Sequence, residues 1–270
     1  MKKVKKRSIF TLGCLLLLWS VLMICADPFA AKVSATTTNT ASSSAGSETK
    51  QLPDKIRTMS YYGYNKVACA VYPSWTSKKT ALKLAKNSKF EIVDKKSQYN
   101  RCKIIYNKKY YYIPYNKVKY NGCNYTKKKY TTQQKLNFVQ KYSSKTKYLI
   151  WISHYTQQVN IFQGKKGHWK LIKTYLCTTG GYTHRSPHGV YKLYKKRKTW
   201  TFSRTYVKYV SFWMSENSFH SRIYRKASAG GGCATPKLGS PGSSGCIRLY
   251  DEDCYYIYKN MPMGTTVISY

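Results

Sequence analysis

The chain has 270 residues, and its 48 lysine and arginine residues outnumber its nine aspartate and glutamate residues to give a formal net charge of +39. A hydrophobic content of 42% supports a folded core and excludes a wholly disordered chain. The mean hydropathy of -0.54 excludes a protein with many membrane spans. The positive excess predicts attraction to a polyanion, which can be nucleic acid, an anionic membrane or an anionic cell wall.

The N-terminus narrows this choice. Residues 1–7 are basic, residues 9–26 are apolar and uncharged, and Val33-Ser34-Ala35 resembles a cleavage signal. Residues 1–35 are therefore expected to be a secretory signal peptide, or a membrane anchor spanning with residues 9–26. Six basic residues and one acidic residue lie in 1–35, which leaves a net charge of +34 on the remainder. We expect a protein exported to the cell wall or beyond, touching the membrane only through this segment and binding anionic cell-wall polymers rather than nucleic acid.

Two regions precede the C-terminal half. Residues 36–58 are small and polar, which predicts a flexible linker. Residues 59–121 read as short strands, with a run at 89–94 and an alternation of Cys102, Ile104 and Tyr106 before a turn. The spacing predicts a small β-barrel, and this stretch resembles bacterial SH3-like domains. In that family such modules often bind cell-wall peptide and carry no chemistry.

The rest of the chain is also mainly β. Residues 122–146 read as a connector with a short helix, capped by Thr131 or Thr132 and reaching Val139. From residue 147 to 270 the pattern predicts further strands and one helix. They are a hairpin over 148–152 and 158–164, strands over 170–181 and 209–217, a helix from about Asp251, and a last strand over 265–268.

Chemistry is concentrated around Cys246, which follows Ser243, Ser244 and Gly245 in a tight turn. Successive amides in such a turn can point at one spot, so the thiol lies beside an anion-binding concavity. His220 is the nearest histidine upstream, and a thiolate near a histidine is the nucleophile of cysteine acyl-transfer enzymes. Taken alone, the same residues also fit an inert buried thiol and a structural histidine.

The segment LGSPGSSGCIRL, residues 238–249, resembles the signature of L,D-transpeptidase catalytic domains. Four further features agree with that family. They are the hairpin with Gln158 and Phe162, the CTTGG segment followed by SPHGVY (186–191), the His220-Ser221 pair, and the closing helix with GTTVISY. The resemblance covers about residues 147–270. It implies a β-sandwich with one or two short helices, in a chain that is mainly β overall.

The resemblance also implies roles for individual residues. Cys246 would be the nucleophile, His220 the general base and acid, and the Ser221 carbonyl would orient the imidazole. The backbone N–H groups of Ser244, Gly245 and Cys246 would stabilise the oxyanion. Arg248 would pair with a substrate carboxylate, or with Asp251 or Glu252 structurally. His188 and Tyr191 would line the cleft. No metal and no cofactor are expected.

The implied activity joins peptidoglycan stem peptides by 3→3 cross-links through a Cys246 thioester, with release of D-alanine. Carbapenems are the implied inhibitors. Two alternatives stay open: an L,D-carboxypeptidase that trims stem tetrapeptides, and a non-catalytic wall-binding protein. An exported nucleic-acid binder is a third reading, which rests on charge alone.

Two departures from the family pattern stand out. Ser244 occupies the position of the motif's usual histidine, and the gap between His220 and Cys246 is longer than usual. The extra residues are expected to form a lid over the cleft or a passive surface loop. Seven cysteines lie beyond the signal segment, so at least one has no partner within a monomer. A disulfide from Cys233 to Cys177 or Cys254 would restrain the loop.

Overall fold

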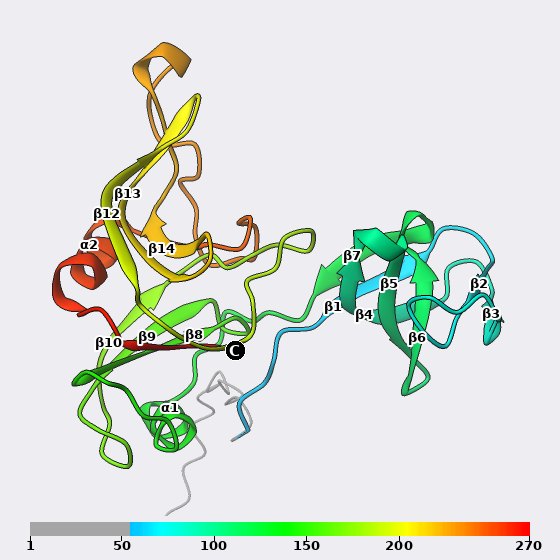
Figure 1. Ribbon diagram of the computed structural model, residues 1–270, viewed down its shortest axis with the longest axis horizontal. Helices are drawn as coiled ribbons and strands as arrows, with labels where there is room; N and C mark the ends of the chain where they lie inside the picture. The colour runs from blue at the N-terminus through cyan, green and yellow to red at the C-terminus, as the bar shows by residue number, and fades with distance from the viewer. Residues whose placement is uncertain (1–54) are drawn as a thin grey trace, which may run out of the picture. The chain divides into compact units, whose positions relative to one another are not determined.

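The computed structural model describes residues 55–270 (Figure 1). The predicted signal segment 1–35 and nearly all of the predicted linker 36–58 lie outside the described residues. Within 55–270 no helix is both long and apolar enough to cross a membrane. The described chain is mainly β, with two α-helices, as predicted.

Residues 61–123 form seven short strands. Five of them make an antiparallel sheet in the order β6-β5-β4-β1-β7, while β2 and β3 pair separately. Alternation places Phe90, Ile92, Cys102, Ile104 and Ile113 in one buried cluster. The strands are β1 (Tyr61–Asn65), β2 (Cys69–Val71), β3 (Leu82–Leu84), β4 (Lys89–Lys96), β5 (Arg101–Tyr106), β6 (Lys109–Pro114) and β7 (Val118–Cys123). The strands predicted at 89–94 and 102–106 are therefore present as β4 and β5.

The predicted short helix is α1 (Thr132–Val139). Thr131 is its N-cap: its side chain accepts a hydrogen bond from Gln134 N, and the Gln134 side chain accepts one from Thr131 N. This reciprocal capping box satisfies two amides that the first helical turn leaves without partners. Val139 is fully buried and anchors the helix in the core.

Two sheets follow, and they form a sandwich. The first has the order β10-β9-β8-β17-β11, and the second has the order β12-β13-β14-β16 with β15 paired to β13. The strands are β8 (Tyr148–Ser153), β9 (Gln158–Gln163), β10 (Lys170–Leu176), β11 (Gly189–Lys192), β12 (Lys195–Thr201), β13 (Thr205–Met214), β14 (Asn217–Ser221), β15 (Tyr224–Arg225), β16 (Ile247–Leu249) and β17 (Thr266–Ser269), with helix α2 (Asp251–Asn260) before β17.

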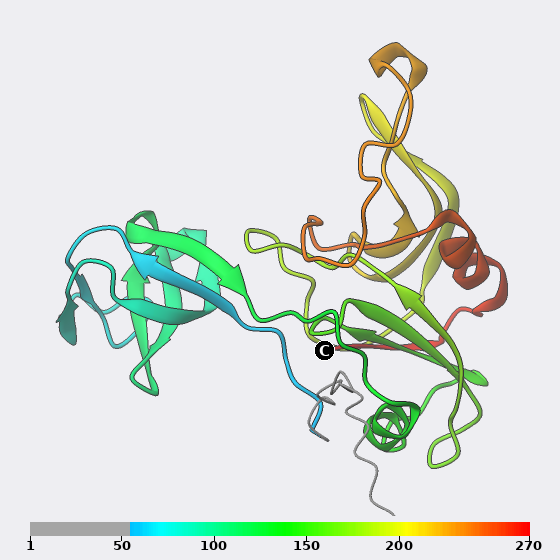
Figure 2. The ribbon, with the colours of Figure 1, turned by 180° about the vertical axis from the view of Figure 1, so that it is seen from behind.

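The central strands β8, β9 and β17 of the first sheet are buried on both faces, which explains the unbroken apolar run of β8. Ile150 and Ile152 join the cluster shared with the second sheet and α2, whereas Leu149 and Trp151 join a cluster beneath α1. Figures 1 and 2 show α1 and α2 on opposite sides of this sheet. Full burial of an isoleucine or leucine side chain contributes about 1.5–3 kcal/mol to stability, so the packing on both faces stabilises the sheet.

The hairpin, the long aromatic strand, the C-terminal helix and the final strand occur where the sequence predicts them, within a few residues. Strand β13 begins four residues earlier than the predicted strand over 209–217, because Thr205 and Tyr206 pair with β15. Strands β11, β12, β15 and β16 were not predicted. They are short or lysine-rich, so local apolar alternation does not mark them.

Candidate active site

Strand alternation brings Cys246 and His220 to one side of a strand pair. β14 and β16 run parallel, with Phe219 opposite Ile247 and His220 opposite Arg248. Phe219, Ile247 and Leu249 point into the inter-sheet core. Because successive side chains of a strand point to opposite faces, Ser218 and His220 share the other face with Cys246 and Arg248.

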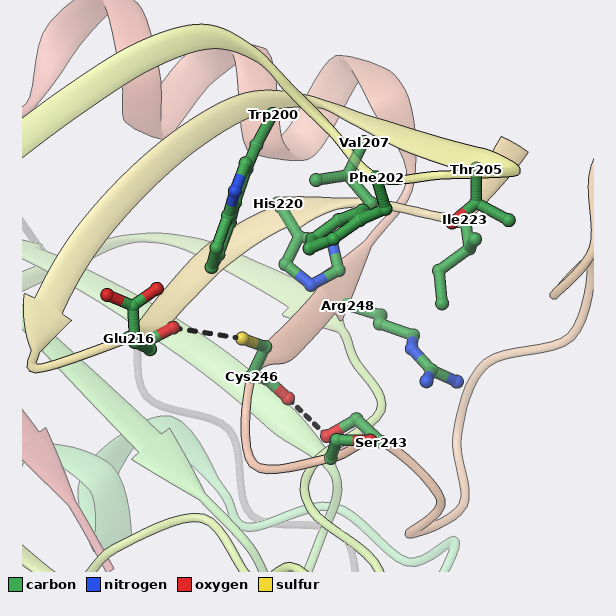
Figure 3. Close-up of a pocket in the computed structure, with 11 residues that line it drawn as sticks. Trp200, Phe202, Thr205, Val207, Glu216, His220, Ile223, Ser243, Cys246 and Arg248 are labelled. Atoms are coloured by element: carbon green, nitrogen blue, oxygen red, sulfur yellow. Dashed lines mark hydrogen bonds between the residues drawn. The ribbon is translucent and has the colours of Figure 1, made fainter. Parts of the chain in front are cut away.

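Three of them, His220, Cys246 and Arg248, line a cavity of about 290 Å³. Figure 3 shows the His220 ring above Cys246 with Arg248 beside it. A rim of side chains from the β12–β13 hairpin and from neighbouring turns completes the cavity. The lining residues are Trp200, Phe202, Thr205, Val207, Glu216, His220, Ile223, Ser243, Ser244, Cys246 and Arg248.

The histidine has a defined tautomer. His220 Nδ1 lies 2.6 Å from the Ser221 carbonyl oxygen, and a carbonyl only accepts, so Nδ1 carries the proton and donates it. The lone pair of the ring is then on Nε2. His220 is 5% exposed. Burial lowers the pKa of His220 to about 4, and the positive charge of Arg248 acts in the same direction. The hydrogen bond to the Ser221 carbonyl acts in the opposite direction. The ring is neutral at neutral pH and can accept a proton.

The thiol is also in its neutral form at rest. The Cys246 Sγ–H donates to the Glu216 carbonyl oxygen at 3.5 Å, and the Ser218 hydroxyl lies 3.7 Å from Sγ. Burial raises the pKa of Cys246; hydrogen bonds from Ser218 and the charge of Arg248 oppose the shift. A neutral thiol beside a neutral imidazole requires proton transfer during nucleophilic attack, because no thiolate is preformed.

The turn before Cys246 is fixed from two sides. The Ser243 hydroxyl accepts from Gly245 N at 3.2 Å and donates to the Cys246 carbonyl oxygen at 2.5 Å. Gly245 has φ +110, and a Cβ there would lie 2.5 Å from the Asn217 Oδ1 atom, so only glycine fits. The Gly245 N–H is therefore already engaged within the turn, which the sequence did not indicate.

Ser186 holds the same turn from the other side. Its hydroxyl accepts from Gly180 N at 2.8 Å and donates to the Gly245 carbonyl oxygen at 2.7 Å. Ser186 is 2% exposed. Ser186, the first residue of the 186–191 segment, thus holds the backbone of the turn before Cys246.

Arg248 has no acidic partner among residues 55–270. Both ion pairs of the described chain use Asp251, with Lys208 at 3.2 Å and Arg222 at 3.8 Å. Of the two roles that the sequence left open, structural pairing with Asp251 or Glu252 is therefore wrong. The unpaired guanidinium borders the Cys246 cavity, where it can receive an anion.

Two predicted cleft residues lie elsewhere. His188 packs edge-on against His154, with ring centroids 4.5 Å apart, and Tyr191 packs on Trp213 at 5.2 Å. The Tyr191 hydroxyl donates to the His188 carbonyl oxygen. Neither residue lines the Cys246 cavity, because β11 is the edge strand next to β17 in the other sheet.

Sequence reasoning missed Glu216, Trp200, Phe202 and Ser218. Ser218 could have been found, since it lies two residues before His220 and a strand returns to the same face every second residue. Trp200 and Phe202 come from another hairpin, and no local signal connects that hairpin to Cys246.

The long segment between His220 and Cys246 is anchored at its base. β15 extends the β13 edge, and the Arg225 N–H donates to the Gly232 carbonyl oxygen at 2.9 Å. Figure 1 shows this segment projecting beside the β12–β13 hairpin. All seven cysteines of the described chain are free thiols. The expected disulfide from Cys233 is wrong because Cys177 and Cys254 are buried in the inter-sheet core, whereas Cys233 lies in the projecting loop beside Tyr224.

The described residues contain no group of three or more histidine, cysteine, aspartate or glutamate side chains that could hold a metal ion. The polar side chains that line the cavity carry the thiol of Cys246, the imidazole of His220, the guanidinium of Arg248, the carboxylate of Glu216 and hydroxyls of threonine and serine. This set is suited to acyl transfer through a cysteine.

Comparisons with known proteins agree with this chemistry. The family model of the L,D-transpeptidase catalytic domain (YkuD) matches residues 147–268. The Bacillus subtilis (strain 168) protein YciB, whose curated name gives L,D-transpeptidase as a provisional assignment, is 33% identical over 88 residues. That alignment covers 31% of this chain and 45% of YciB, so the chain spans less than half of that relative.

Solved structures are also similar. A fused zinc-dependent amidase/peptidase/peptidoglycan-binding protein of Clostridium acetobutylicum is 27% identical, over 52% of this chain and 59% of that chain, with a TM-score of 0.42. An L,D-transpeptidase of Stackebrandtia nassauensis is 18% identical, over 51% and 62%, with a TM-score of 0.38. LdtMt1 in complex with imipenem is 13% identical, over 46% and 59%, with a TM-score of 0.38. On the family match, residues 147–268 of this chain carry the L,D-transpeptidase catalytic domain.

Proposed function

We propose that the protein is a peptidoglycan L,D-transpeptidase that forms 3→3 cross-links through a Cys246 thioester. The observation that carries the proposal is the shared cavity of Cys246 and His220, with Nδ1 of the imidazole held by the Ser221 carbonyl. That bond leaves Nε2 as the proton acceptor. The donor substrate would be a stem tetrapeptide that ends in D-alanine.

In the first half-reaction Cys246 Sγ forms a bond to the carbonyl carbon of the third stem residue, and Nε2 of His220 takes the thiol proton. The bond to the D-alanine nitrogen then breaks, and that nitrogen takes the proton from Nε2. The oxyanion would be stabilised by backbone N–H groups of the Ser244–Cys246 turn, at about 3 kcal/mol per donor. Gly245 N–H contributes only if it leaves the Ser243 hydroxyl, so the proposal relies first on Ser244 and Cys246.

In the second half-reaction the side-chain amine of an acceptor stem attacks the thioester. The carbon–sulfur bond breaks and the amine proton returns to sulfur through Nε2. The unpaired guanidinium of Arg248 supports the proposal, because a stem peptide presents a carboxylate that it can bind. If water takes the place of the amine, the product is a trimmed tripeptide.

The wall location is part of the same proposal. Residues 1–35 would direct export, the unit of β1–β7 would act as an SH3-like wall-binding module, and the basic surface would contact anionic polymers. Carbapenems would acylate Cys246, as suggested by the imipenem complex of LdtMt1.

The test is mass spectrometry of the full chain incubated with disaccharide-tetrapeptides. We expect 3→3 dimers and free D-alanine from the wild type and from Cys233→Ala, and neither product from Cys246→Ala. Cys233 is the matched control because it is also a partly exposed free thiol. Tripeptides without dimers would replace the proposal with an L,D-carboxypeptidase. No product, together with no imipenem adduct on Cys246, would leave a non-catalytic wall-binding protein.

A further inference from the structure

A second cavity, of about 440 Å³, lies on the face of the first sheet that α1 covers. It is lined by the connector before α1, by β9 and β10, and by the segment leading to the Cys246 turn. The lining residues are Thr126, Lys127, Lys129, Thr156, Gln158, Thr174, Leu176, Leu238 and Gly239. None of them lines the Cys246 cavity. The connector is fixed there, since Thr126 N donates to the Tyr155 carbonyl oxygen at 2.8 Å.

A buried ammonium is bonded to one of the lining residues, Thr174. Lys135 of α1 is 5% exposed, and its Nζ atom donates to the Thr174 hydroxyl at 3.0 Å. No carboxylate pairs with it, because both ion pairs of residues 55–270 use Asp251. Burial lowers the pKa of Lys135 to about 8, and the nearby charge of Lys129 acts in the same direction. Buried charges in proteins are normally paired, so this ammonium lacks an anion.

The cavity also holds an acceptor without a donor. Gln158 is 2% exposed, and its Oε1 atom has no hydrogen-bond partner. The neighbouring threonine hydroxyls do not donate to this oxygen, because each donates elsewhere. Thr156 donates to Ser153 Oγ at 2.8 Å, and Thr174 donates to Asn160 Oδ1 at 3.1 Å. An unmade hydrogen bond of a buried group costs about 1–3 kcal/mol, so a ligand that donates to Oε1 would recover that cost.

The ammonium without an anion and the acceptor without a donor together define the ligand. It must bring a negative group for Lys129, Lys135 and Lys127, and an N–H or O–H donor beside it for Gln158. The exposed side chain of Leu176 and the half-buried side chain of Leu238 add apolar walls, which suit a small aliphatic group. A volume of about 440 Å³ falls in the range of small-molecule sites and exceeds what a single inorganic ion fills.

We propose that this cavity binds the carboxylate end of an N-acylated amino acid or peptide. The carboxylate lies against the ammonium groups of Lys129 and Lys135, the adjacent amide N–H donates to Gln158 Oε1, and the side chain contacts Leu176 and Leu238. The proposal concerns a second site and does not depend on the chemistry at Cys246.

The experiment uses the full chain with Cys246→Ala and methyl-labelled leucine, followed by NMR. Leu176 and Leu238 line the second cavity alone, so their methyl resonances separate it from the first. The probes are N-acetylalanine, its C-terminal amide, O-acetyllactate and inorganic phosphate. We expect N-acetylalanine to shift both leucines, and the amide to bind at least roughly tenfold more weakly, because it lacks the charge-assisted bonds. O-acetyllactate, which keeps the carboxylate and lacks the N–H, is expected to bind several-fold more weakly.

Variants complete the test. Lys129→Gln should weaken N-acetylalanine binding several-fold, and the exposed Lys166→Gln should leave it unchanged. Lys135→Met should abolish binding without lowering the melting temperature, since it removes a buried charge that has no acidic partner. Equal binding of the amide, an equal loss in Lys166→Gln, or no leucine shift with N-acetylalanine would overturn the proposal. Phosphate that binds as tightly as N-acetylalanine would replace it with an inorganic-anion site.

Discussion

Burial of the His220 side chain fixes its protonation state and links that state to the stability of the fold. One ring nitrogen of His220 is hydrogen-bonded to the Ser221 carbonyl, and no carboxylate among residues 55–270 pairs with the ring. Burial is therefore the largest influence on the pKa of His220. A neutral ring is what a general base requires. The depressed pKa also means that the unfolded chain binds a proton more readily than the folded chain does.

A stability prediction follows for His220. Between its folded pKa of about 4 and the ordinary value of 6.5, the unfolded state holds the extra proton. The free energy of unfolding should therefore fall as pH drops from 6.5 to 4 and should be unaffected by this group above 6.5. We expect urea unfolding to show this loss in the wild type relative to His220→Gln. Parallel curves for the two proteins would contradict the assignment of a buried neutral imidazole.

Arg248 gives a second prediction at this scale. Arg248→Gln should raise the KM for a tetrapeptide donor by roughly tenfold or more, because a charge-assisted pair with a carboxylate contributes about 1.5–3 kcal/mol. The kcat should change less, since the guanidinium is expected to bind substrate in the ground state as well. Arg225→Gln, an exposed arginine on β15, is the control. A fall in melting temperature with an unchanged KM would indicate a structural role instead.

Among the elements, the parallel pair β14–β16 makes the site. Its inward residues are apolar and its outward residues are polar, so the same alternation that builds the core presents Cys246 and His220 together. The turn before β16 then needs its own support, which Ser243 and Ser186 supply through hydroxyl bonds.

Ser186→Ala tests that support. The variant leaves the buried Gly180 N–H and Gly245 carbonyl without their hydroxyl partner, which should cost about 1–3 kcal/mol of unfolding free energy. Imipenem acylation of Cys246 should slow as the turn loosens. Ser240→Ala, in the exposed part of the same segment, serves as the control in urea unfolding and in adduct kinetics. An unchanged acylation rate in Ser186→Ala would show that the turn does not depend on this residue.

At the scale of the molecule, charge is the dominant property. Residues 55–270 contain two ion pairs, both on Asp251, so few of the basic side chains are neutralised internally. Many instead lie over aromatic rings, as Arg101 does over Tyr72 at 3.8 Å. Such contacts do not cancel the positive charge, so the molecule as a whole still attracts a polyanion.

Binding of the full chain to purified cell walls should therefore weaken strongly between low and high salt. Screening shortens the reach of these charges to about 10 Å at 0.1 M salt and about 3 Å at 1 M. Sedimentation with walls at increasing salt concentration measures the effect. Walls stripped of anionic polymers are the control and should bind less at low salt. Salt-independent binding, equal on stripped walls, would show that the charge excess has no part in wall attachment.

Local pattern was sufficient for many elements. The capping residues around Thr131 located α1, and the acidic cluster at Asp251 located the start of α2. Alternation located β5, the run between turn residues located β4, and the polar turn of the hairpin located β8 and β9. Motif resemblance supplied Cys246 and His220. The lysine-rich strand β12 and the short strands β11 and β15 were not predicted, because they become strands by pairing with neighbouring strands and not through their own composition.

The sequence by itself determined the mainly β class, the choice of Cys246 and His220 as candidate site residues, and the charge. Only the tertiary structure decided which side chains share a cavity. It placed Glu216, Trp200 and Phe202 beside Cys246, turned His188 and Tyr191 away, left Arg248 without an acidic partner, and enclosed Lys135 against Thr174. The reason is physical: alternation along a strand is local, whereas a cavity is formed by residues that meet only when sheets and helices pack.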